Sequence, residues 1–192
     1  MVRHVLGSII LLMTIAGGPP PAIAQNRIEA TLIKSLAATP LENLRIRFSS
    51  DGLPYGTTVE MEIRGDGSFL RYDRQGLELT ALENRGRLDP ERLKPLLRLL
   101  LDIKVWQDVP LTRVGVPDEG MTSVKVSAGA TEATISEWQN DMKSQQRLIK
   151  VKHEMYALVP TGARSCVLVP KPPTPKVYAK MHAIAGACDG LD

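Results

Sequence analysis

Aromatic residues, histidines and any large excess of charge are scarce in this 192-residue chain. Aromatic side chains make up 4% of it, so Leu, Ile, Val, Met and Ala must fill the core. The formal net charge is +3, and acidic and basic residues are interleaved, which does not favour a nucleic-acid-binding protein. None of the three histidines lies four residues from another, so the sequence predicts no zinc-binding helix, and we expect no metal or cofactor site.

Long hydrophobic runs are scarce too, and the most apolar one lies at the N-terminus, from Val5 to Ala16. It is too short to cross a bilayer, which takes about 20 apolar residues. A basic residue, Arg3, precedes it, and a small-x-small tripeptide follows it at positions 22–24. This order of segments is typical of a secretory signal peptide, although a buried N-terminal helix or a membrane anchor would also be apolar.

We therefore predict that residues 1–24 are a signal peptide, cleaved between Ala24 and Gln25. The first cysteine, Cys166, lies far from this position, so a lipid-anchored lipoprotein is not expected. The prediction implies a periplasmic or secreted protein with no membrane anchor after signal removal.

The chain has two cysteines, Cys166 and Cys188. In an oxidising compartment such a pair predicts one disulfide bond, whose loop closure stabilises a protein by about 3 kcal/mol. Two free thiols are the alternative. A zinc site is disfavoured because zinc ligands usually include closely spaced cysteines.

Alternation of apolar and polar residues with a period of two predicts strands in two parts of the chain. The predicted strands are residues 44–48, 59–64, 68–73, 77–82, 121–127 and 131–138. A Gly-Asp-Gly turn at 65–67 joins two strands of the first part, and an Ala-Gly-Ala turn at 128–130 joins those of the second. Each part therefore has the pattern of a β-hairpin.

Two amphipathic helices are predicted, one after each strand-rich part. Leucines at helical spacing follow Asp89, a good N-cap residue, and Pro90, which suits the first helical position. Pro95 either kinks this helix or marks its true start, with Lys94 before it. The other helix is predicted from position 140 or 141 to about 159.

The order hairpin, helix, hairpin, helix predicts an α+β domain over residues 44–159. We expect an antiparallel sheet of two hairpin units with two amphipathic helices packed on one face. An N-terminal helix or leader at 25–43 precedes the domain, and its helical spacing covers 26–38. A proline-rich C-terminal arm at 160–192 carries both cysteines, and is either a docking segment for a partner's aromatic groove or a stiff strap across the domain.

Several motifs together resemble a group of small exported bacterial domains of unknown function. They are the Gly-Asp-Gly hairpin at 65–67, the segment LDPERLKPLLRLL at 88–100, the Trp106 that follows it, and the strand pair at 121–138. The resemblance implies export and an α+β fold. It implies no activity and no site residue.

No catalytic residue is predicted, although two groups were candidates. His153 next to Glu154 is either a general base oriented by a carboxylate or, as we favour, an exposed polar residue of a helix. Glu60 and Glu62 point to the same side of one strand, which is more typical of a solvated face than of a glycosidase pair.

These observations predict a non-enzymatic binding or interaction module of the bacterial envelope. Its partner would be another envelope protein or a cell-wall ligand. Two alternatives are a small envelope hydrolase using His153, and an inhibitor of a secreted enzyme that presents the loop at 108–120 or the proline-rich arm.

Overall fold

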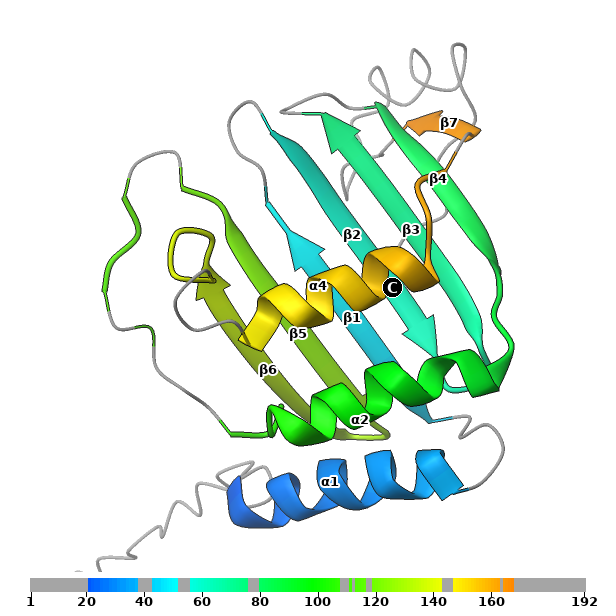
Figure 1. The fold of residues 1–192 in the computed structure, drawn as a ribbon, viewed down its shortest axis with the longest axis vertical. Coiled ribbons are helices and arrows are strands. Elements are labelled where there is room, and N and C mark those ends of the chain that lie inside the picture. The colour runs from blue at the N-terminus through cyan, green and yellow to red at the C-terminus, as the bar shows by residue number, and fades with distance from the viewer. Residues whose placement is uncertain are drawn as a thin grey trace, which may run out of the picture.

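A computed structural model describes residues 21–37, 43–51, 56–75, 80–107, 111, 113–116, 119–142, 147–162 and 164–167. Its centre is an open seven-stranded antiparallel sheet with the strand order β6-β5-β1-β2-β3-β4-β7 (Figure 1). The strands are β1 (Leu44–Ser50), β2 (Thr57–Arg64), β3 (Ser68–Gln75), β4 (Thr80–Arg87), β5 (Met121–Ala128), β6 (Thr131–Trp138) and β7 (Arg164–Val167). The α+β class and the antiparallel sheet are therefore confirmed.

The sheet differs in detail from two separate hairpin units. β1 lies between β2 and β5 and pairs with both, so it joins the two strand-rich parts into one sheet. β4 is described from Thr80 and continues beyond the predicted end at position 82 to Arg87, through Asn84 and Gly86, which are poor strand formers. The predicted residues 77–79 lie outside the described residues. β7 comes from the predicted proline-rich arm and pairs with β4 at the sheet edge.

Three α-helices are found among the described residues: α1 (Pro21–Ala37), α2 (Lys94–Asp102) and α4 (Arg147–Leu158). α4 crosses one face of the sheet in front of β5, β1 and β2 (Figure 1). α1 packs against α2 and against β5 and β6. Within this part of the chain, no helix combines the length and the apolar character needed to cross a membrane.

The sequence left open whether Pro95 kinks the helix or marks its start, and the start of α2 decides between these alternatives. A short 3₁₀-helix, η1 (Pro90–Leu93), comes first, and the Asp89 side chain accepts a hydrogen bond from the Glu91 backbone amide at 3.0 Å. α2 then starts at Lys94 with Pro95 in its first turn, where proline costs no hydrogen bond. Pro95 therefore marks the start of the helix and does not kink it.

α1 begins before the predicted cleavage position, at Pro21, and ends one residue before the predicted end of the segment 26–38. Its two fully buried side chains, Ile28 and Leu32, both lie after Gln25. Removal of residues 1–24 would therefore shorten α1 without removing the residues that attach it to the core.

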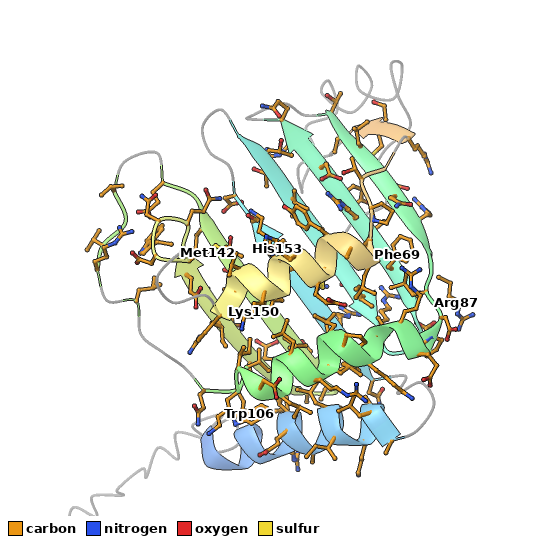
Figure 2. The ribbon with its side chains drawn as sticks, in the orientation of Figure 1. Phe69, Arg87, Trp106, Met142, Lys150 and His153 are labelled. Carbon is orange, nitrogen blue, oxygen red and sulfur yellow. The ribbon has the colours of Figure 1, made fainter. Side chains whose placement is uncertain are left out.

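The hydrophobic core lies between the helices and one face of the sheet. Strand β1 contributes Leu44, Ile46 and Phe48, each at most 3% exposed. Leu96 and Leu100 of α2 and four residues of α4 belong to the same cluster. Trp106, which follows α2, is partly buried against this core (Figure 2).

Candidate functional site: an arginine-lined cavity on the polar face of the sheet

The sheet face opposite the core, which we call the polar face, gathers basic side chains. Successive strand residues point to opposite faces, so Arg45 and Arg47 of β1 point away from the core. In the strand register, Arg47 is paired with Glu62 of β2 and with Lys125 of β5, while Arg45 is paired with Arg64 of β2. Cross-strand pairing thus places three arginines around one carboxylate, with Lys125 one strand further away.

Glu62 is the centre of this group. Its carboxylate accepts hydrogen bonds from Nε of Arg47 and of Arg64, both at 2.8 Å, and Nε of Arg45 lies 3.5 Å away. Burial by itself raises the pKa of Glu62, but the hydrogen bonds from Arg64 and Arg47 and the nearby charges outweigh it, so the pKa is lowered. Glu62 is therefore a fixed anion that orients three guanidinium groups.

The prediction that Glu60 and Glu62 both lie on a solvated face of β2 is correct for Glu60 only. Glu60 is exposed, as expected. Glu62 is only 3% exposed, because the long arginine side chains of the neighbouring strands cover it. The alternation in the sequence placed Glu62 on the correct face but did not show how many arginines the register brings beside it.

A cavity of about 460 Å³ opens beside these arginines. Its lining includes Arg45, Arg47, Arg64, Lys125, Ser127 and Glu132. Lys125 and Glu132 form an ion pair at 2.6 Å across β5 and β6. Among the described residues, the lining thus combines three arginines and Lys125 with the carboxylate of Glu132.

Arg47 has a donor that is not used within the described structure. Its Nε binds Glu62, but its Nη2 is buried and has no hydrogen-bond partner. A buried donor without an acceptor costs about 1–3 kcal/mol, and more when it is charged. Guanidinium groups bind oxyanions well, so the arginines that line the cavity make it a candidate anion-binding site.

The core side of the sheet holds a different charged group, Arg71 with Asp73. The two side chains form a bidentate pair, at 2.8 and 2.7 Å, and both are at least nine-tenths buried. Arg71 also donates to the Val159 carbonyl and to the Thr161 hydroxyl, and its guanidinium lies 4.7 Å from the centre of the Tyr156 ring. These contacts attach the end of α4 to β3, which is a structural role.

A second cavity, of about 400 Å³, lies at the end of β3, β4 and β7. Hydroxyl and amide side chains such as Thr57, Gln75 and Ser165 line it, together with Asp73. Among the described lining residues, the carboxylate of Asp73 is held by Arg71, and no arginine or lysine lines this cavity.

His153 lies on the outer surface of α4 and is exposed (Figure 2). It lines neither cavity. The enzymatic alternative requires His153 in a concave pocket with other polar groups, and neither of these two cavities provides one.

The segment from Arg113 to Glu119 is held by an ion-pair network. Arg113 donates two hydrogen bonds to the Glu119 carboxylate, at 2.7 and 2.6 Å, and another to Asp141 at 3.1 Å. The hydrogen bonds from Arg113 outweigh the effect of burial and lower the pKa of Glu119 to about 2. Gly115 packs on the Trp138 ring, where an added Cβ would lie 2.6 Å away. Val114 is 89% exposed at the tip.

Cys166 lies in β7, fully buried, beside Tyr72 and Ala81 on the polar face. It is not a free thiol. Its predicted partner, Cys188, and the remainder of the proline-rich arm after Val167 lie outside the described residues, so their pairing stays a prediction.

Across the part of the chain that the structure describes, no group of three or more His, Cys, Asp or Glu side chains is arranged to hold a metal ion. No known family model matches the chain, and a comparison with curated proteins found no relative. The resemblance to small exported bacterial domains therefore stays a prediction, and the candidate site rests on the geometry alone.

Proposed function

We propose that this protein is a non-enzymatic binding module of the bacterial envelope and that it contacts its ligand through the arginine-lined cavity. The observation that carries this proposal is the cavity of about 460 Å³, which Arg45, Arg47 and Arg64 line beside the buried carboxylate of Glu62. Cavities of this size are typical of sites that hold a small ligand.

The lining residues favour binding over catalysis. Arginine keeps its proton at any physiological pH, so it orients and holds an anion but does not transfer protons. Glu62, the buried carboxylate beside the cavity, has a lowered pKa and is occupied by arginines, which makes it a poor general acid. Arg47 and Arg64 serve as fixed hydrogen-bond donors in this proposal.

The envelope location rests on the signal peptide predicted at residues 1–24, and the Cys166–Cys188 bridge belongs to the same proposal. A disulfide is expected to persist only in an oxidising compartment. Mass spectrometry of protein recovered from the producing cells tests both points. We expect a mature N-terminus at Gln25 and a mass two hydrogens below that of the reduced chain. An intact Met1 with two free thiols would contradict the proposal.

Site-directed photo-cross-linking in the native compartment tests the contact surface. A photoreactive residue at position 127 sits in the cavity, while one at position 153 sits on the exposed surface of α4 and serves as the matched control. We expect adducts from position 127 and none from position 153. Adducts from position 153 alone would contradict the proposal, as would substrate turnover by the purified protein that a single substitution abolishes.

A second candidate function, inhibition of a secreted enzyme, is favoured by one observation. Arg113, Glu119 and Trp138 hold the segment around Val114 in a fixed shape that leaves Val114 exposed. A rigid loop with an exposed side chain loses little entropy on binding. Replacement of Val114 by Asp should then abolish inhibition of a secreted protease panel, and a protein that inhibits no member of the panel would remove this candidate.

A further inference from the structure

We infer that an apolar patch on the polar face of the sheet is the docking surface of this chain's own C-terminal segment 177–188, held there by a bridge between Cys166 and Cys188. The docking patch consists of Leu70, Tyr72, Ala81 and Cys166, on β3, β4 and β7. None of these residues lines the arginine-lined cavity. The inference uses the bridge of the proposed function and does not depend on what the cavity binds.

The docking patch is buried, although the described helices and the main core lie on the other face of the sheet (Figure 1). Tyr72 and Ala81 are each 3% exposed, and Cys166 is 0% exposed. Elsewhere on the same polar face, the side chains of Arg45 and Arg47 are 38% and 31% exposed. A tyrosine side chain stands roughly perpendicular to its sheet, so burial of Tyr72 requires atoms that lie over this part of the face.

The interactions of the docking patch indicate which part of the chain lies over it. Tyr72 and Cys166, and Arg85 on the same face of β4, each have a further interaction partner. Cys166 is not a free thiol, and the chain has one other cysteine, Cys188. The residues that carry Cys188 follow directly after β7, which is the edge strand beside the patch. The C-terminal residues are therefore the covering group that the observations favour.

The segment 177–188 has an apolar pattern that matches the docking patch. Its larger apolar residues and its cysteine recur at helical spacing, at Val177, Met181, Ile184 and Cys188. A helix would place all four on one face, so Cys188 would lie within an apolar surface, as Cys166 does. Such a helix is about 18 Å long. That length is enough to cross β7, β4 and β3, since neighbouring strands lie about 4.8 Å apart.

Docking of this segment distinguishes the two roles that the sequence left open for the proline-rich arm. Because the patch buries the apolar face of the segment, that face is not available to a groove on another protein. The arm is then a strap across the domain. The patch occupies β3, β4 and β7, whereas most of the cavity lining comes from β1 and β5.

The rate at which N-ethylmaleimide labels Cys166 in the purified protein tests this inference. Cys188→Ser removes the bridge and leaves Cys166 as the sole thiol. We expect labelling of this variant to be about a hundredfold slower than in urea, because apolar contacts keep the segment over the patch. In that background Met181→Asp should speed labelling about tenfold, since docking would bury a carboxylate. Ala179→Asp is the matched control on the opposite side of the helix, and should change the rate less than about twofold.

Equal labelling rates in the two aspartate variants would overturn the inference. So would labelling of Cys188→Ser as fast as in urea. Neither aspartate replaces a residue of the described core, so a loss of fold does not complicate the comparison. The expected rates together with no adducts from position 127 would retain the docking patch and remove only the cavity as the ligand site.

Discussion

Alternate residues of β1 point to opposite faces of the sheet and have different roles. Leu44, Ile46 and Phe48 are buried in the core and stabilise the fold by removing apolar surface from water. Arg45 and Arg47, on the polar face, are about one-third exposed and surround a carboxylate. The core face therefore determines stability, while the polar face provides the chemistry of the candidate site.

The charged groups on the two faces differ in the same way. Arg71, on the core side, has acceptors for its guanidinium in Asp73, Val159 and Thr161. Arg47, on the polar face, shares one carboxylate with two other arginines and keeps Nη2 unpaired. Arg71 closes a structural contact, whereas Arg47 retains a donor for a ligand.

The largest effect on stability is expected from a core substitution. Phe48→Ala should lower the free energy of unfolding by about 4 kcal/mol, because Phe48 is 2% exposed and packs edge-on against Tyr156 at 5.9 Å between ring centres. Urea denaturation measures this loss. A change below about 1 kcal/mol would show that the sheet and α4 do not share a close-packed core.

Removal of one partner of the buried ion pair should have the next largest effect. Asp73→Ala leaves Arg71 buried without its carboxylate and should cost about 3 kcal/mol in the same measurement. The double variant Arg71→Met, Asp73→Leu should recover most of the loss, since neither charge is then left unpaired. An equal loss in both variants would contradict a purely structural role for the pair.

The corresponding change on the polar face should cost less. Glu62→Gln should lower the free energy of unfolding by about 1 kcal/mol, because its arginine partners are 31–51% exposed and water solvates them when they are released. A loss as large as that of Asp73→Ala would mean that the two faces do not differ as described.

Acid should act on the polar face through Glu62. The pKa of Glu62 is lower in the folded protein than in the unfolded chain, so its contribution to stability is present above the ordinary glutamate pKa of about 4.3. That contribution is lost as the pH falls through the lower, folded-state value. The stability difference between the wild type and Glu62→Gln should therefore shrink below about pH 4. A difference that is constant from pH 7 to pH 3 would contradict the lowered pKa.

The smallest global effect is expected at the loop that Arg113 holds. Glu119→Gln should leave the urea midpoint nearly unchanged but alter the fluorescence of Trp138, whose indole NH donates to the Arg113 carbonyl at 3.2 Å. A Trp106→Phe background isolates this signal. Because the pKa of Glu119 is about 2, the wild-type signal should persist in acid until the pH falls toward that value. Loss of the wild-type signal already at pH 5 would contradict this.

Much of the fold was predictable because local patterns and tertiary structure agree. The alternation at 44–48 and 59–64, the turn at 65–67 and the cap at Asp89 all correspond to observed features. The predicted strand at 77–82 ended too early, because Asn84 and Gly86 weaken the strand pattern of β4. β7 was not predicted because its four residues are too few to show a clear alternation, and because it pairs with β4, which is distant in the sequence.

The candidate site was not predicted, for a different reason. Arg45, Arg47 and Arg64 are visible in the sequence, but only the register of β1 with β2 and β5 brings them around Glu62 and beside Lys125. The signal that the sequence did offer was the alternation of arginine with core residues in β1. Like charges directly opposite each other on neighbouring strands destabilise a sheet. Arginines at positions 45 and 47 of β1, with Arg64 opposite Arg45, would therefore be unfavourable on a face that only contacts water.

Nuclear magnetic resonance of the arginine Nε–H groups tests the central claim most directly. We predict that the ligand captured by cross-linking from position 127 shifts the signals of Arg45, Arg47 and Arg64, which line the cavity, and leaves those of Arg71 and Arg113 unchanged. Shifts confined to Arg113, or no shift of Arg47 at saturating ligand, would contradict the account.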